Sequence, residues 1–206
     1  MRGGGDLEFK AAKNSLEIPQ ILANPANLWR ADFQYDLEFK QRAQILLDLL
    51  SPTAKKSLKS VLDLGCGVQY FREVLEENGL KLKYCGVDLY PHKSDNILCD
   101  FNANEFPQFR KNAFDCVVCA GLFEYILDLS CFVGKICTLE PKYILCSYNF
   151  ANISPQNKIW VEKRLNQQEL LGLFFGYGYG LNLYKTHKRA NPTGYFCFCK
   201  LDLMDK

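Results

Sequence analysis

The sequence has no long apolar run, no apolar leader segment and no marked excess of one charge. No stretch reaches the roughly 18 apolar residues of a membrane-spanning helix, and residues 1–10 carry a polar glycine run where a secretory signal has an apolar core. Lysine plus arginine number 25 against 23 acidic residues, a net charge of +2, whereas nucleic-acid binding usually leaves a strongly basic composition. We therefore expect a cytoplasmic protein without a membrane span, and the composition argues against a nucleic-acid partner.

Zinc-site patterns are also missing, although the chain has ten cysteines. Cys116 and Cys119 form a CxxC, and Cys197 and Cys199 a CxC, but neither has the turn residues and second ligand pair of a zinc ribbon. Most cysteines lie in apolar, strand-like runs, where a free thiol behaves as a small hydrophobic side chain. We expect core cysteines, kept reduced in the cytosol, and no metal site.

The length of 206 residues fits one substantial hydrophobic core. Residues 1–26 mix glycines, prolines and scattered charges, which is typical of an arm or cap outside the core. We expect this arm to be followed by a single domain over residues 27–206. The sequence gives no indication of the oligomeric state.

Helical and strand-like patterns alternate through the predicted domain. The predicted helices cover residues 28–50, 71–78, 123–139 and about 167–175. Pro52 is expected to end the first helix, and Asn166 and Glu169 are expected to cap the start of the last one. The predicted strands cover residues 60–64, 82–88, 96–99, 113–120, 143–148, 180–185 and 194–201. Strands separated by helices predict a doubly wound, mostly parallel, Rossmann-like α/β sheet, and the last two strands predict an antiparallel C-terminal edge hairpin.

The strongest local signal is the segment 61–67, Val-Leu-Asp-Leu-Gly-Cys-Gly, a buried strand that runs into a glycine turn before a helix. Such a turn lets a ligand lie against the backbone at the carboxyl end of the sheet. A nicotinamide fingerprint needs a third glycine at the position of Tyr70, so a dinucleotide is disfavoured. Asp63 would repel a pyrophosphate and attract the ammonium and sulfonium groups of S-adenosylmethionine.

Two further acids follow the next two predicted strands. Asp88 ends the second strand, where its two oxygens can accept both ribose hydroxyls. Asp100 follows the third strand and can accept from an adenine amine, while Phe101 can cover the ring. With Asp63, these acids predict one polar-lined adenosine pocket at the strand ends.

This order of residues resembles the class I S-adenosylmethionine-dependent methyltransferase family over about residues 28–201. The motif positions that carry the resemblance are Asp63-x-Gly65-x-Gly67, Asp88, Asp100 and Phe114-Asp115. Gln69 stands where many members have a third glycine. The segment 121–126, Gly-Leu-Phe-Glu-Tyr-Ile, is similar to the Leu-Glu-His-Ile type of small-molecule methyltransferases such as quinone-biosynthesis enzymes, with Tyr125 in place of the common histidine.

The resemblance implies S-adenosylmethionine as cofactor, and it implies which residues bind it. Asp63, Gly65 and Gly67 would hold the methionine end, Asp88 the ribose, Asp100 and Phe101 the adenine, and Ala120 and Gly121 would face the sulfonium; their neighbours Cys66 and Leu89 complete the predicted cofactor site.

Catalytic residues are less clearly marked than cofactor residues. Methyl transfer is an in-line displacement at an activated carbon, so alignment of the reactants suffices and no covalent nucleophile is required. Glu124 and Tyr125 are the two catalytic candidates, with the alternative that Glu124 offsets the dipole of the predicted helix. His92 and His187 are interpreted as loop or surface residues, and we expect no single essential base.

Two regions outside these motifs can shape the rest of the site. Arg30 and Tyr35 suit a lid over the cofactor, with core packing and surface pairing as equal alternatives. The loop 149–164, with Asn152, Pro155 and Trp160, and the turn near Lys185 can form an acceptor pocket.

The resulting prediction is an S-adenosylmethionine-dependent methyltransferase that acts on an unidentified, small-molecule acceptor. The segment after the fourth strand lacks the Asp/Asn-Pro-Pro-Tyr pattern of enzymes that methylate exocyclic base amines. Two alternatives stay open at this point. One is a catalytically degenerate member that binds cofactor or protein, and the other is an NAD-dependent oxidoreductase.

Overall fold

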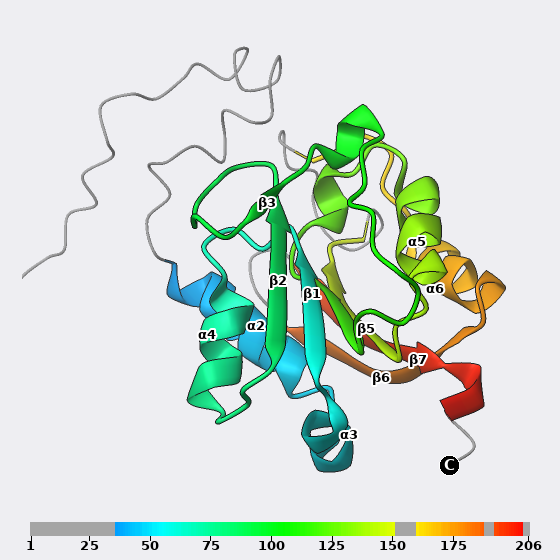
Figure 1. Cartoon of the computed structure of the whole chain (residues 1–206). Coiled ribbons are helices and arrows are strands. Elements are labelled where there is room, and N and C mark those ends of the chain that lie inside the picture. Colours follow the sequence, from blue (N-terminus) through cyan, green and yellow to red (C-terminus); the bar gives the residue numbers. More distant parts are fainter. Residues whose placement is uncertain (1–35, 151–159, 188–191, 204–206) are drawn as a thin grey trace, which may run out of the picture.

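A computed structural model describes residues 36–150, 160–187 and 192–203. It is an α/β fold built on a seven-stranded sheet of order β3-β2-β1-β4-β5-β7-β6 (Figure 1). The strands β1 to β5 are parallel, and β7 runs antiparallel to both β5 and β6. The predicted fold class is therefore confirmed. The predicted arm 1–26 lies outside the described residues.

The parallel strands follow the apolar runs of the sequence. They are β1 Ser60–Leu64, β2 Lys83–Asp88, β3 Ile97–Leu98, β4 Cys116–Cys119 and β5 Tyr143–Tyr148. The first and the last match their predicted bounds, because each is a short apolar run with clear breaks on both sides. All five residues of β1 are buried, as expected for a central strand covered on both faces.

The C-terminal hairpin consists of β6 Tyr179–His187 and β7 Thr193–Lys200. The strand β7 is inserted between β5 and β6, with Tyr143 opposite Cys199. Its first seven residues are buried, whereas β6 forms the outer edge and has a register shift between Leu181 and Leu183. The predicted antiparallel pair is confirmed.

Two helices match their sequence signals closely. The helix α4 Tyr70–Glu77 directly follows the glycine turn. The helix α6 Gln167–Gly176 begins with the predicted capping box, in which the Asn166 side chain accepts from the Glu169 backbone N–H and the Glu169 carboxylate accepts from the Asn166 N–H.

The predicted helix 28–50 is wrong at its C-terminal end. The observed helix α2 Leu37–Leu47 stops five residues before Pro52, and Pro52 opens a second helix, α3 Pro52–Ser57, that the sequence analysis missed. The side chain of Ser51 caps this helix by accepting from Ala54 N–H at 3.1 Å. Proline suits the first helical position because its missing N–H would have no intrahelical partner there.

The predicted helix 123–139 is divided into two elements. A short 3₁₀ turn, η3 Phe123–Tyr125, comes first, and α5 Leu129–Thr138 follows. Asp128 starts α5 by accepting from Cys131 N–H at 2.9 Å. An aspartate at this position competes for the backbone N–H groups and so favours a new helix start over a continuous helix.

Helices cover both faces of the sheet. In Figure 1, α2 and α4 lie together on one side, while α5 and α6 lie on the other. The core beneath α5 and α6 is rich in aromatic side chains, including a stacked pair of Phe174 and Phe198 at 3.9 Å between ring centroids. The opposite core is mainly aliphatic. Each fully buried large apolar side chain stabilises the fold by about 1.5 to 3 kcal/mol.

All ten cysteines lie within the described residues, and none forms a disulfide. Eight of them are buried, which confirms the prediction of core thiols. Among the residues that the structure describes, no three His, Cys, Asp or Glu side chains are grouped so that they could hold a metal ion. In the same part of the chain, no helix has the length and apolar character needed to cross a bilayer.

Candidate functional site

A pocket lies at the carboxyl ends of β1, β2 and β4, where α/β sheets commonly bind ligands. The structure places all twelve site residues predicted from the sequence in its lining: Asp63, Gly65, Cys66, Gly67, Asp88, Leu89, Asp100, Phe101, Ala120, Gly121, Glu124 and Tyr125. They meet because parallel strands end at a common edge. The contacts that each would make with a ligand remain predictions.

The glycine turn after β1 needs its glycines for conformation and for space. Gly65 has a φ of 72° and Gly67 a φ of 53°, which are left-handed conformations that suit glycine. A Cβ on Gly65 would lie 2.9 Å from Leu122 Cδ1, so the turn also packs tightly against the segment after β4. The N–H groups of Gly65 and Cys66 both donate to the Val87 carbonyl, at 2.8 and 3.2 Å. The turn is therefore fastened to the end of β2.

Asp63 is a buried carboxylate with one free oxygen. Asp63 is only 2% exposed. Tyr84 donates its hydroxyl to Oδ2 at 2.6 Å, while Oδ1 has no hydrogen-bond partner in the described structure. The pKa of Asp63 is raised to about 7, mainly by burial; the hydrogen bond from Tyr84 opposes this rise and the charge of Asp88 adds to it. A cationic ligand group beside Oδ1 would favour the ionised form.

Asp88 already holds the glycine turn in place. Its Oδ2 accepts from Gly67 N–H at 2.7 Å, and its Oδ1 accepts from Tyr90 N–H at 3.1 Å. Burial raises the pKa of Asp88, although these two hydrogen bonds oppose the shift. Each oxygen has a second lone pair, so Asp88 can accept from a ligand while it holds the turn.

Asp100 and Phe101 start a short 3₁₀ turn, η2 Phe101–Ala103, at the far side of the pocket. Asp100 caps this turn by accepting from Asn102 N–H at 2.9 Å. The ring of Phe101 packs against Phe132, with 4.9 Å between centroids, and Phe106 also contacts it. Phe101 therefore connects the pocket to the aromatic core.

Glu124 is a buried acid that joins two loops. Only 1% of it is exposed, and its Oε1 accepts from both Asn149 N–H at 2.9 Å and Asn149 Nδ2 at 2.6 Å. Its other oxygen, Oε2, has no partner among the described residues. Burial raises the pKa of Glu124, while the nearby Arg42 lowers it. The idea that Glu124 offsets the dipole of a long helix is wrong, because α5 begins only at Leu129.

Tyr125 and Trp160 form an aromatic wall beside Glu124. The Trp160 indole donates to the Tyr125 hydroxyl at 3.3 Å, and the Arg164 guanidinium lies 4.8 Å from the centre of the Trp160 ring. Arg164 also donates to the Asn149 carbonyl at 2.8 Å. Burial raises the pKa of Tyr125 to about 12. The hydroxyl therefore stays protonated at neutral pH and can donate a hydrogen bond.

Arg42 is the main site residue that the sequence analysis missed. It belongs to the predicted helix 28–50, and the sequence analysis gave it no role, but its side chain lines the pocket. Its guanidinium lies against the Gly121 backbone, where a Cβ would collide with it, and 5.0 Å from the Phe39 ring centre. Its Nε is buried and has no hydrogen-bond partner in the part of the chain that the structure describes. In the sequence, only the apolar residues that flank Arg42 could have indicated that its side chain is partly buried.

Other residues considered in the sequence lie at different distances from the pocket. His92 and Trp160 border it. His187 belongs to β6, and neither it nor Lys185 lines the pocket. Residues 188–191 of the turn near Lys185 lie outside the described residues. Arg30, Tyr35, Asn152 and Pro155 lie outside the described residues.

The fold is shared with solved methyltransferase structures at low sequence identity. The 1,6-didemethyltoxoflavin N1-methyltransferase of Burkholderia thailandensis, solved with S-adenosylhomocysteine, is 12% identical, with a TM-score of 0.61 over 89% of this chain and 85% of that chain. The magnesium protoporphyrin IX methyltransferase of Synechocystis PCC 6803, solved with S-adenosylmethionine, is 13% identical, with a TM-score of 0.61 over 91% of this chain and 99% of that chain. The mitomycin 7-O-methyltransferase is 13% identical, with a TM-score of 0.60 over 91% and 61%.

No curated protein matches the sequence. A family model described as a methyltransferase domain matches residues 35–172, which is more than half of the chain. The chain therefore belongs to the methyltransferase-domain family, as a class I S-adenosylmethionine-dependent methyltransferase.

Proposed function

We propose that the pocket binds S-adenosylmethionine between Asp63 and Arg42 and that the chain transfers the methyl group to a small-molecule acceptor. One observation carries this proposal. Three buried polar atoms that have no hydrogen-bond partner among the described residues, Asp63 Oδ1, Arg42 Nε and Glu124 Oε2, belong to residues that line the same pocket. Buried polar groups are normally hydrogen-bonded, so three such atoms around one pocket point to a polar ligand.

The methionine end of the cofactor matches two of these groups in charge. The ammonium fits Asp63 Oδ1, and the carboxylate fits the guanidinium of Arg42. The backbone offers little alternative for the carboxylate, because the N–H groups of Gly65 and Cys66 donate to Val87 and that of Gly67 donates to Asp88. Among the described residues that line the pocket, Arg42 is the only lysine or arginine.

The nucleoside end is assigned to the neighbouring strand ends. Asp88 keeps lone pairs for the two ribose hydroxyls after accepting its two backbone hydrogen bonds. Asp100 and Phe101 stand at the far side of the pocket, where a carboxylate oxygen and an apolar ring suit an adenine. Leu89 adds apolar surface between them.

The acceptor end is assigned to Glu124, Tyr125 and Trp160. When bound, the cofactor supplies a methyl group on a positively charged sulfur, so the protein needs no covalent nucleophile. Tyr125 can donate a hydrogen bond, and Glu124 Oε2 can accept one or receive a proton from the acceptor. A small molecule is supported by the enclosed aromatic wall and by the fold neighbours, which are named for toxoflavin, porphyrin and mitomycin chemistry.

Calorimetry with S-adenosylhomocysteine, the demethylated product, tests the cofactor site. We expect Arg42→Met to weaken its binding by about 30-fold, since a hydrogen bond to a charged group contributes about 1.5 to 3 kcal/mol. The same variant should bind 5′-methylthioadenosine, which has no carboxylate, as well as the original chain does. Arg110→Met, at an exposed position, is the matched control. Equal losses for both ligands would contradict the role of Arg42.

A label-transfer experiment tests catalysis separately. Methyl-labelled S-adenosylmethionine is incubated with the protein and a metabolite extract, and protein-dependent transfer to a small molecule is expected. The absence of any transfer would favour the alternative of a catalytically degenerate binding member, and transfer to protein would contradict a small-molecule acceptor. Stabilisation by NADH rather than by S-adenosylhomocysteine would favour the oxidoreductase alternative, against which the family match already argues.

A further inference from the structure

Gln69 occupies a conformation that glycine would adopt more easily. It follows the glycine turn as the N-cap residue of α4, with φ 68° and ψ 43° in the left-handed region. It makes no side-chain capping bond to the helix, and it is 3% exposed. A bulky residue persists in such a conformation only when its surroundings hold it there. The related family pattern often has glycine at this position, so the side chain needs an explanation.

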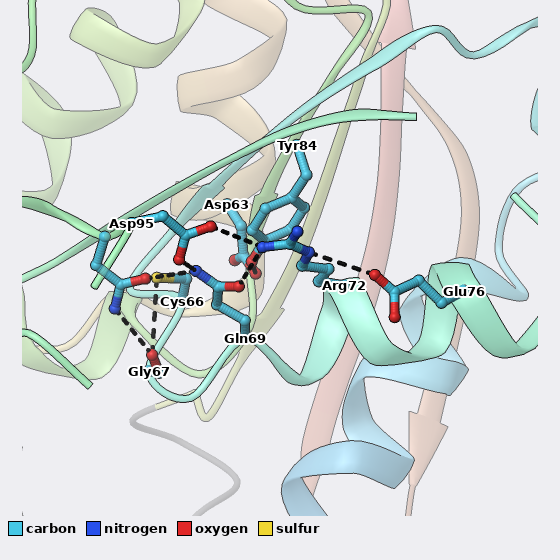
Figure 2. A network of polar contacts seen from close by, with 9 residues as sticks. Asp63, Cys66, Gly67, Gln69, Arg72, Glu76, Tyr84 and Asp95 are labelled. Carbon is cyan, nitrogen blue, oxygen red and sulfur yellow. Dashed lines mark hydrogen bonds and ion pairs between the residues drawn. The ribbon is translucent and has the colours of Figure 1, made fainter. Parts of the chain in front are cut away.

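The side-chain amide of Gln69 is fully used by its neighbours. Its Nε2 donates to Asp95 Oδ1 at 2.8 Å and to Asn96 Oδ1 at 2.7 Å, and its Oε1 accepts from Arg72 at 3.0 Å. Arg72 in turn pairs with Asp95 Oδ2 at 2.7 Å. Figure 2 shows Gln69 at the centre of this network, between α4 and the loop that precedes β3. We call Gln69, Arg72, Asp95 and Asn96 the amide clamp.

The amide clamp joins the two backbone segments that form the cofactor pocket. Asn96 Nδ2 donates to the Gly67 carbonyl at 3.1 Å, while the Gly67 N–H donates to Asp88. Gly67 belongs to the turn after β1, whereas Asp88 is the last residue of β2 and Asn96 the last residue of the loop between β2 and β3. The Gly67 N–H is thus tied to the end of β2, and the Gly67 carbonyl is tied to that loop.

Close packing beneath the clamp supports the same conclusion. A Cβ on Gly86 in β2 would lie 2.8 Å from Cys66 Sγ, 3.2 Å from Asn96 Oδ1 and 3.3 Å from Gln69 Nε2. The turn and the clamp therefore rest directly on the β2 backbone. A side chain at position 86 would push them apart, so the arrangement depends on both the amide and the missing side chain.

We propose that Gln69 is a positioning residue, which holds the glycine turn and the β2–β3 loop together in the arrangement that receives the cofactor. This inference rests on the proposed function. Gln69 itself does not line the pocket, so it acts through Gly67, Asp95 and Asn96. A site organised before binding needs less ordering when the ligand arrives and therefore binds it more tightly.

Gln69→Gly is the direct test, because glycine accepts the left-handed backbone and removes only the amide. We expect its melting temperature to stay within about 3 °C of the original, since relief of the strained conformation offsets the lost hydrogen bonds. We expect S-adenosylhomocysteine to bind about tenfold more weakly by calorimetry. Hydrogen exchange of the ligand-free protein should become about tenfold faster over residues 66–70 and 89–96 and unchanged in β5.

Gln69→Glu and Gln44→Glu form a matched pair. Each replaces an amide whose Nε2 donates to an aspartate, Asp95 at 2.8 Å or Asp48 at 3.1 Å, and so brings two carboxylates together. Only the first is expected to weaken binding, by more than Gln69→Gly does. Asn96→Ala breaks the clamp without altering the backbone at 69, and it serves as the second variant if Gln69→Glu does not fold.

The outcomes separate this inference from the proposed function. If the original chain binds no S-adenosylhomocysteine, the proposed function fails, while the exchange rates of the ligand-free protein still test the clamp. If the original chain binds and Gln69→Gly shows the same affinity and the same exchange, Gln69 has no positioning role. A drop in melting temperature without a change in affinity also overturns the proposal, because it reveals only a structural contribution.

Discussion

The two ends of the parallel sheet carry aspartates in opposite situations. At the carboxyl end, Asp63 accepts a hydrogen bond from Tyr84, and its other oxygen is buried with no partner within residues 36–150, 160–187 and 192–203. At the amino end, Asp115 accepts from Lys59 N–H at 2.7 Å and Ser60 N–H at 3.2 Å and pairs with Lys142 at 2.8 Å. Burial raises both pKa values, but the partners of Asp115 outweigh it and lower the pKa, whereas that of Asp63 rises to about 7.

The two aspartates distinguish a binding end of the sheet from a structural end. The interactions of Asp115 are complete within the fold, so this residue fastens β1 to β4 and β5. Those of Asp63 are incomplete, so part of its electrostatic environment must come from elsewhere. Strongly shifted acids with a free buried oxygen in a pocket are therefore useful markers of function, provided that geometry agrees.

Asp63→Asn and Asp115→Asn should change the free energy of unfolding in opposite directions, and this is the strongest effect that we expect. The pKa of Asp63 rises from 3.8 to about 7 on folding, so the folded chain binds its proton more tightly and stability falls as pH rises from about 4 to 7. At pH 8, Asp63→Asn should raise the free energy of unfolding by about 2 to 4 kcal/mol, whereas Asp115→Asn should lower it by about 1 kcal/mol. Urea unfolding measures both.

Unfolding at pH 4 is the control for these two substitutions. At pH 4 the native Asp63 is already protonated, so the gain from Asp63→Asn should nearly disappear. The lowered pKa of Asp115 has the opposite consequence: its stabilising interactions are present at neutral pH and are lost as pH falls through that pKa. Two substitutions that destabilise equally at pH 8 would remove the distinction between the two ends.

The second expected effect concerns ligand binding at the carboxyl end. Asp88→Ala removes the acceptor of the Gly67 and Tyr90 N–H groups and the proposed acceptor of two ribose hydroxyls. We expect S-adenosylhomocysteine to bind about 100-fold more weakly, as two hydrogen bonds to a charged group are lost. Thermal-shift titration measures the change, with Asp115→Ala as the variant that should keep normal affinity. Full ligand stabilisation of Asp88→Ala would show that the ribose lies elsewhere.

The smallest expected effect is the pH dependence of that affinity. Because the ligand ammonium favours ionised Asp63, affinity should fall about tenfold per pH unit below 7 and level off above it. Calorimetry in buffers of different ionisation enthalpy should detect the release of nearly one proton on binding at pH 6. Asp63→Asn should show neither response, and a flat profile in the original chain would contradict the role of Asp63.

The sequence predicted those parts of the site that short, contiguous sequence motifs define. An apolar strand with a glycine turn and an acid at the end of each following strand define positions that the sheet must bring together, as Asp63, Asp88 and Asp100 demonstrate. Strand β1 was predicted to the residue because glycine marks its end. The family followed from the same residues.

The missed parts depend on contacts between distant segments. Arg42 lies on a helix whose orientation is set by packing against α4, β5 and β7, and periodicity alone could not tell its buried side from its exposed side. Glu124 was assigned to a helix because apolar residues recur on both sides of Asp128. In the structure its carboxylate accepts two hydrogen bonds from Asn149, which directly follows β5. Pro52 was interpreted as a helix end, although it can equally begin a helix.

The inserted strand β7 has a consequence for how the chain reaches its native state. It leaves the ribosome after the other strands that the structure describes, yet it pairs with β5, which was made about fifty residues earlier, as the partners Tyr143 and Cys199 illustrate. Until β7 emerges, the nascent chain exposes the open edge of β5 and its apolar surface. A chain truncated just before Thr193 should therefore recruit chaperones more strongly than the chain of 206 residues.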